Sequence, residues 1–137
     1  MSQRSPDPTQ DGVGKYVTLL LLVAVKHGHH HVRIKPAGTT AIVQFWDDVQ
    51  WCDREDVIDR ALPLHMPVMR KLAEMLAELV PPPGKQAYGA FMLQRHGIET
   101  LYVHGRLEND FEVTAELELV DEATFGTRPY QRPRPSA

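Results

Sequence analysis

Residues Val17 to Val25 are apolar except for Thr18, whereas later in the chain apolar residues alternate with polar ones. A short continuous apolar run fits either a buried helix or a central strand. Here Gly28 follows the run at a place where glycine commonly ends a helix, because glycine adopts the left-handed conformation without strain. We therefore expect a helix over residues 15–27.

Strands are predicted over five later segments, which are residues 32–35, 41–46, 87–94, 98–103 and 111–119. The last segment alternates most strictly. One of its faces carries the apolar side chains of Phe111, Val113, Ala115, Leu117 and Leu119. The other face carries Glu112, Thr114, Glu116 and Glu118. Such alternation predicts an antiparallel sheet with one face in the core and one face in water.

A second long helix is predicted to begin near residues 66–67, because apolar residues recur on one stripe at helical spacing. The stripe consists of Val68, Leu72, Met75, Leu76 and Leu79. Residues 81–84, which read PPPG, end this helix, and a shorter helix is predicted over residues 53–61. Together the elements predict an α+β fold, in which two or three helices cover one face of an antiparallel sheet of about five strands.

The length of 137 residues fits a single domain, which we place at residues 15–122. Residues 1–14 are polar and are predicted to form a flexible tail. Residues 123–137 are rich in proline and arginine and predict a second tail. This tail is either an extended docking peptide or a disordered end.

The composition of the chain limits its possible binding partners and its expected cellular compartment. A formal net charge of −3 argues against broad attraction to nucleic acid or acidic membranes. The apolar run falls far short of the ~20 residues of a membrane-spanning helix, and the acidic leader does not resemble a secretory signal. The single cysteine, Cys52, precludes an internal disulfide and suits a reducing compartment. We expect a cytoplasmic protein without membrane insertion.

Candidate metal chemistry gathers at the histidine junction, His27–His31. On a strand, His29 and His31 would share a face, and imidazoles are ligands for zinc, copper or nickel. The alternative is a solvated polar turn, since no cysteine pair or spaced acidic partner accompanies the histidines. Asp47 and Asp48 fit turn positions, and no nucleophile-elbow or zinc-protease motif occurs. We therefore expect neither an enzyme nor a cofactor.

Trp46 is the strongest candidate for contact with a partner. It is predicted on the polar face of its strand, with Gln44 on the same face and Arg33 across the hairpin. An aromatic ring with a polar group on a wet face is typical of contact surfaces, and a tryptophan covered by its own fold is the alternative. We predict Arg33, Gln44 and Trp46 as partner-binding residues.

In their order along the chain, these elements resemble the non-catalytic N-terminal domain of the ATPases that drive type II secretion and type IV pili. The likeness spans residues 15–120 and rests on the segments LLLLVAVKHG, HHHVRIKP, VQFWDDV, LP followed by VMRKLA, and GAF. The matching positions are Gly28, Val32, Ile34, Pro36, Phe45, Asp48, Gly89 and Phe91.

The resemblance implies a stand-alone protein-interaction or regulatory module, whose partner is a secretion or pilus ATPase or the chain itself. The ATPase core of the family would follow residue 120, and we expect this chain to lack it. In the phosphate-loop lookalike at residues 9–16, Tyr16 stands where a Ser or Thr would hold Mg²⁺. The alternative function is a small ligand- or metal-binding sensor that uses the histidine junction, His27–His31.

Overall fold

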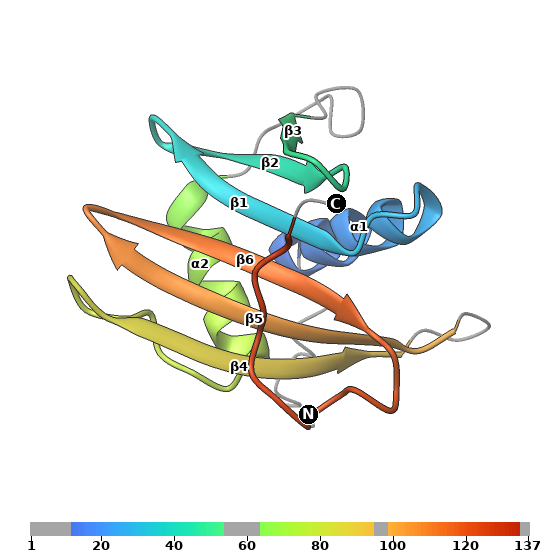
Figure 1. The fold of residues 1–137 in the computed structure, drawn as a ribbon. Helices are drawn as coiled ribbons and strands as arrows, with labels where there is room; N and C mark the ends of the chain where they lie inside the picture. The colour runs from blue at the N-terminus through green and yellow to red at the C-terminus, as the bar shows by residue number, and fades with distance from the viewer. Residues whose placement is uncertain (1–11, 54–63, 95–98, 135–137) are drawn as a thin grey trace, which may run out of the picture.

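The computed structural model describes residues 12–53, 64–94 and 99–134, which form one antiparallel sheet with two helices behind it (Figure 1). The helices are α1 (Gly12–Lys26) and α2 (His65–Met75). The strands are β1 (His31–Ala37), β2 (Thr40–Trp46), β3 (Trp51–Asp53), β4 (Gln86–Leu93), β5 (Leu101–Asp110) and β6 (Glu112–Val120). They lie side by side in the order β3-β2-β1-β6-β5-β4, so that the first and last strands meet at the centre of the sheet.

The predicted α+β class and the antiparallel sheet are confirmed, with six strands where about five were expected. The additional strand is β3, which has three residues and pairs with the end of β2. β5 extends to Asp110, well past the predicted end at Val103. Most of the short helix predicted over residues 53–61 lies outside the described residues, whereas Asp53, its predicted cap, belongs to β3.

The core lies between the helices and the rear face of the sheet. Its fully buried side chains include Val17, Leu20 and Leu21 of α1, Leu72 of α2, and Ile34, Phe45, Leu107 and Leu117 of the sheet. Gly28 ends α1 in the left-handed conformation, with a φ of 74°. The backbone N–H of His29 donates to the carbonyl of Ala24 at 2.8 Å, which gives a hydrogen-bond partner to one of the last carbonyl groups of the helix. The predicted role of Gly28 is therefore confirmed.

α2 ends earlier than its apolar stripe predicted. The helix ends at Met75, and Ala77 turns the chain with a φ of 57°. Leu76 is buried against the sheet, whereas Leu79 is 85% exposed and takes no part in the core. The prediction for Leu79 is therefore wrong, because the helical period no longer applies once Ala77 has reversed the chain.

Phe111 corrects the prediction for the last strand. It forms the tip of the β5–β6 hairpin between the paired residues Asp110 and Glu112, with a φ of 62° and a fully exposed side chain. Val113 lies in the core as expected. A tight hairpin takes one residue out of the alternation, and in this chain that residue is Phe111.

The C-terminal segment, which we define as residues 121–134, runs across the front face of the sheet (Figure 1). It covers charged side chains of β5 and β6, so that Arg106, Glu116 and Glu118 are each only 7% exposed. The prediction of a fully wet face is therefore wrong, and this part of the predicted tail is packed on the domain. In the described part of the chain, neither helix is long and apolar enough to cross a membrane.

Candidate functional site

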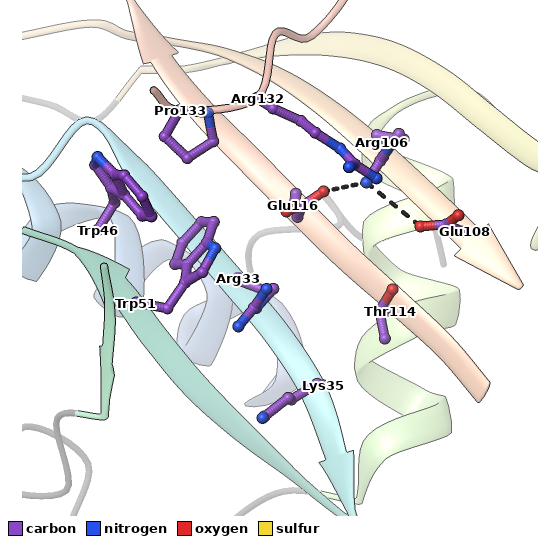
Figure 2. Close-up of a pocket in the computed structure, with 10 residues that line it drawn as sticks. All are labelled: Arg33, Lys35, Trp46, Trp51, Arg106, Glu108, Thr114, Glu116, Arg132 and Pro133. Atoms are coloured by element: carbon purple, nitrogen blue, oxygen red, sulfur yellow. Dashed lines mark hydrogen bonds and ion pairs between the residues drawn. The ribbon is translucent and has the colours of Figure 1, made fainter. Parts of the chain in front are cut away.

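A groove opens on the front face of the sheet, beside the C-terminal segment and over side chains of β1, β2, β3, β5 and β6 (Figure 2). Its volume is about 380 Å³. We call it the tryptophan groove, and it is lined by Arg33, Lys35, Trp46, Trp51, Arg106, Glu108, Thr114, Glu116, Arg132 and Pro133. Since the helices cover the rear face of the sheet, the front face is the one that presents polar side chains to solvent.

Strand register brings the predicted contact residues together. Arg33 of β1 lies opposite Gln44 of β2, and Gln44 lies opposite Asp53 of β3. The Arg33 guanidinium donates to Gln44 Oε1 through Nε at 2.9 Å and through Nη2 at 2.5 Å. Gln44 Nε2 in turn donates to Asp53 Oδ1 at 2.7 Å. These bonds join three strands and hold the Arg33 side chain in one orientation.

The two tryptophans form the aromatic wall of the groove. Trp46 and Trp51 are paired across β2 and β3, and their rings meet edge to face with centroids 5.4 Å apart. The Arg33 guanidinium carbon lies 4.5 Å from the centroid of the Trp51 ring, within cation–π range. Trp51 therefore belongs to the site, although only Trp46 was predicted there. The four-residue turn that separates the two tryptophans was the available sequence signal.

The roles of the three predicted residues differ. Arg33 and Trp46 both line the groove. Gln44 is 8% exposed, and its amide oxygen and nitrogen are both occupied by Arg33 and Asp53. Its side chain therefore positions Arg33, and we assign it no direct contact with a partner.

Positive charge predominates in the groove. Four cationic side chains line it with only two carboxylates, and both carboxylates lie beside Arg106. Arg106 pairs with Glu116 and lies 3.4 Å from Glu108. Burial lowers the pKa of Arg33, and the negative charge of Glu116 partly opposes this shift. Within the described residues, no ion pair joins Lys35 or Arg132 to a carboxylate, so their charges are available to a partner.

Cys52, which follows Trp51 in β3, is not activated as a nucleophile. Its thiol donates to Asp47 Oδ2 at 3.1 Å. This hydrogen bond, together with burial and the nearby negative charge, raises the pKa of Cys52 and disfavours the reactive thiolate. Asp47 also accepts backbone hydrogen bonds from Val49 and Gln50, which confirms its predicted role in a turn.

The histidine junction does not form a compact cluster. His29 precedes β1, stacks on Phe45 at 5.2 Å and makes a 3.0 Å hydrogen bond with the Trp46 carbonyl oxygen. His31 begins β1 and makes a 3.1 Å hydrogen bond with the carbonyl oxygen of Gln131. The expectation that His29 and His31 share one face of a strand is wrong, because the strand starts only at His31. Among the described residues, no three metal-ligating side chains gather.

No model of a known protein family matches this sequence, and no curated protein matches it either. The assignment of a function therefore depends on the residues of the groove and on the order of the elements that position them.

Proposed function

We propose that this chain is a non-catalytic protein-interaction module that binds its partner through the tryptophan groove. The observation that carries the proposal is the pairing of Trp46 and Trp51 with a surplus of cationic side chains in one groove. Tryptophan and arginine are enriched where interfaces are most strongly bound, since they combine a large apolar area with polar contacts. The surplus of positive charge favours a partner segment that is acidic.

The partner that we propose is an ATPase of type II secretion or type IV pili, or a second copy of the chain. Support comes from the order of elements, in which a helix precedes a hairpin, a second helix and three further strands. Two of the matching positions also have structural roles in this order. Gly28 ends α1, and Gly89 allows the backbone of α2 to approach β4. A cytoplasmic location is part of the proposal, since Cys52 is a free thiol.

Binding of a purified secretion or pilus ATPase from the same organism tests this function directly. We expect Trp51→Ala and Lys35→Glu each to weaken binding by about tenfold or more, because each removes a groove contact. Phe111→Ala is the matched control, since it removes a fully exposed aromatic ring from the hairpin tip. Equal binding by all three variants would show that the groove is not the contact surface.

A second candidate function is a sensor for a small ligand or a metal ion. The observation that favours it is an open cavity of about 930 Å³, whose lining includes His29, His30 and His31. Calorimetric titration with zinc and with nucleotides tests this alternative. Zinc binding that disappears in a His29→Ala/His31→Ala variant would support it, and identical heats for the variant and the wild type would eliminate the metal site.

A further inference from the structure

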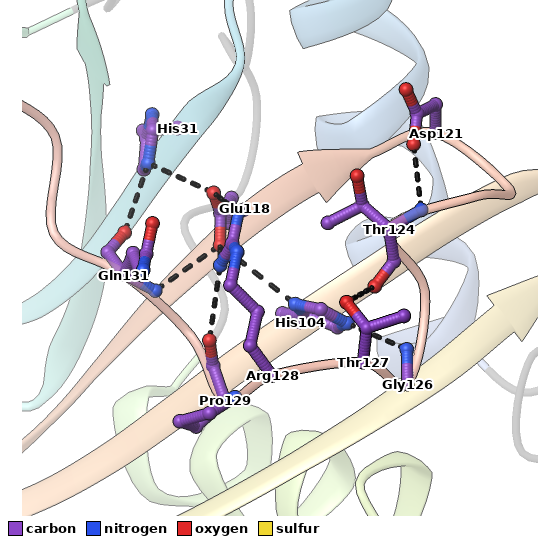
Figure 3. Close-up of polar contacts among 10 residues, drawn as sticks. All are labelled: His31, His104, Glu118, Asp121, Thr124, Gly126, Thr127, Arg128, Pro129 and Gln131. Atoms are coloured by element: carbon purple, nitrogen blue, oxygen red, sulfur yellow. Dashed lines mark hydrogen bonds and ion pairs between the residues drawn. The ribbon is translucent and has the colours of Figure 1, made fainter.

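The C-terminal segment is bound to the front face through the buried carboxylate of Glu118 (Figure 3). Arg128 donates to both oxygens of this carboxylate, from Nη1 at 2.9 Å and from Nη2 at 2.8 Å. The backbone N–H of Gln131 donates to Glu118 Oε1 at 3.1 Å. Two-pronged arginine–carboxylate contacts are strong and selective in geometry, so these bonds fix the register of the segment on the sheet.

Tyr130 provides an apolar anchor between these polar contacts. It is 5% exposed, and its ring centroid lies 5.8 Å from the guanidinium carbon of Arg106. The imidazole of His31 meets the same ring edge to face at 6.0 Å. His31 also holds the Gln131 carbonyl, so one residue of the sheet contacts two consecutive residues of the segment.

A second attachment lies nearer the start of the segment. The backbone N–H of Gly126 donates to Nε2 of His104 at 3.0 Å, and His104 is itself almost fully buried. Phe125 stacks on the His104 ring, with the centroids 5.9 Å apart. His104 therefore holds on the sheet the turn at Phe125 and Gly126, which precedes Arg128 and Tyr130 in the segment.

The positions of the sheet residues that contact the segment are set by strand pairing and do not depend on the segment. The side chains that hold the segment come from three adjacent strands, since β6 pairs with both β1 and β5. They are His31 of β1, His104 and Arg106 of β5, and Glu118 of β6. The side chains that the segment covers are mostly charged or polar, so water can replace its contacts when it leaves. Release of the segment therefore does not require the sheet to unfold.

The contacts that hold the segment also do not require a covalent link to β6. They are a guanidinium on a carboxylate, an aromatic ring on Arg106 and His31, and the backbone N–H and carbonyl groups of Gln131. Proline at residues 129 and 133 restricts the free conformations of such a segment, which lowers the entropy lost on binding. A segment of another protein with the same residues in the same order would make the same contacts.

We infer that the front face holds a peptide-binding site for an Arg-Pro-Tyr segment of a partner protein, and that the chain's own C-terminal segment fills this site in cis. The segment then acts as a tethered competitor, whose local concentration keeps the site closed until a partner displaces it. This site adjoins the tryptophan groove: the two share Arg106, and Arg132 and Pro133 of the same segment line that groove. The inference stands whether or not the groove binds an acidic partner.

The test uses the full chain and a labelled synthetic peptide with the sequence TRPYQRPR of residues 127–134. Fluorescence anisotropy measures its binding to the wild type, to Arg128→Ala and to the Arg128→Ala/Glu118→Gln double variant. We expect Arg128→Ala to bind the peptide at least about tenfold more tightly than the wild type, because its own segment competes less. The double variant is expected to lose this binding.

A peptide in which the first arginine is replaced by alanine is the matched control, and it removes the same contact without altering the protein. Near-ultraviolet circular dichroism checks that each protein variant is folded. If the double variant does not fold, the alanine peptide still tests whether the arginine is recognised. The inference is overturned if folded Arg128→Ala does not bind the peptide, or if it binds both peptides equally.

Discussion

Replacing Gly89 by alanine is expected to destabilise the fold from its rear face, away from both proposed sites. Gly89 lies in the middle of β4, where the end of α2 packs on the sheet. A Cβ at this position would lie 2.5 Å from the carbonyl oxygen of Leu76 and 2.8 Å from its Cβ. Ordinary contact begins at 3.4 Å, so the backbone at Leu76 must retreat by about 0.9 Å, the difference between 2.5 and 3.4 Å.

The backbone at Leu76 has little freedom to retreat. The N–H of Leu76 donates to Leu72 at 2.9 Å, and the N–H groups of Ala77 and Glu78 donate to Glu74 and Ala73. Overpacking of a core costs about 1–3 kcal/mol, and a clash with backbone belongs in the upper half of this range. Alanine also lowers the conformational entropy of the unfolded chain, which offsets about 0.4–1 kcal/mol of this destabilisation. We expect a net loss of about 2 kcal/mol and a fall in Tm of roughly 6–10 °C.

Gly105→Ala is the matched control for this prediction. Its Cβ would meet the methyl carbons of Leu76 at 2.9 Å and of Leu117 at 3.0 Å. Both are ends of flexible side chains, so the control is expected to lose only about 1 kcal/mol. Shortening the neighbour in a Leu76→Ala background should relieve the clash of Gly105→Ala but not that of Gly89→Ala, whose main conflict is with the carbonyl oxygen.

Urea unfolding followed by circular dichroism measures these differences, and an unchanged m-value shows that the unfolded state is comparable. A double-mutant cycle with Leu76→Ala then gives the coupling energy for each glycine. Our account of the close approach between α2 and β4 would be refuted if Gly89→Ala were as stable as the wild type. It would also be refuted if the destabilisation by Gly89→Ala and by Gly105→Ala decreased by the same amount in the Leu76→Ala background.

Three further predictions concern single side chains. Burial alone would raise the pKa of Glu118, but its bonds to Arg128 and Gln131 and the nearby positive charge hold the pKa below its usual value. The stability that the ionised Glu118 carboxylate contributes is complete above its pKa in the unfolded chain and is lost as pH falls through its pKa in the folded protein. Hydrogen exchange should therefore show that the protection of the residue 131 amide decreases below about pH 4.5 in the wild type but not in Glu118→Gln. Phe111→Gly removes an unfavourable left-handed side chain and should stabilise the protein by up to about 1 kcal/mol, and a lower urea midpoint would contradict this. Tyr130→Phe removes a buried hydroxyl that has no hydrogen-bond partner and should be neutral or stabilising by thermal melting, whereas Tyr130→Ala should be destabilising.

Local patterns predicted the parts of the fold that depend on local physics. The apolar run and Gly28 indicated α1 and its end, and strict alternation indicated which face of β6 is buried. The errors occurred where an element ends. Whether Leu79 belongs to α2 depends on the reversal at Ala77, and whether Phe111 belongs to β6 depends on the register of a hairpin. Neither feature is visible as a period in the sequence.

The candidate site was predicted as far as the β1–β2 hairpin extends. Arg33 and Trp46 could be placed on one face because a short turn fixes the register between neighbouring strands. Glu118 was predicted to be exposed, because alternation identifies the face of a side chain but not what covers that face. The cover is a segment without periodicity, and its position depends on contacts such as Arg128 with Glu118, which join separate elements.

The burial of Glu118 also indicates what can replace the C-terminal segment. A carboxylate that loses its cation in a covered site is destabilising, because burial removes water without providing another positive charge. A neutral segment that covered Glu118 would leave it in this state, whereas open solvent would not. The site therefore discriminates among three occupants: it tolerates water, rejects a neutral peptide and accepts a peptide that carries a guanidinium. In contrast, the tryptophan groove next to it has a surplus of cations and favours an acidic segment. Two neighbouring sites of opposite charge preference on one sheet face can bind two different segments, and the C-terminal segment, which contributes to both, couples them.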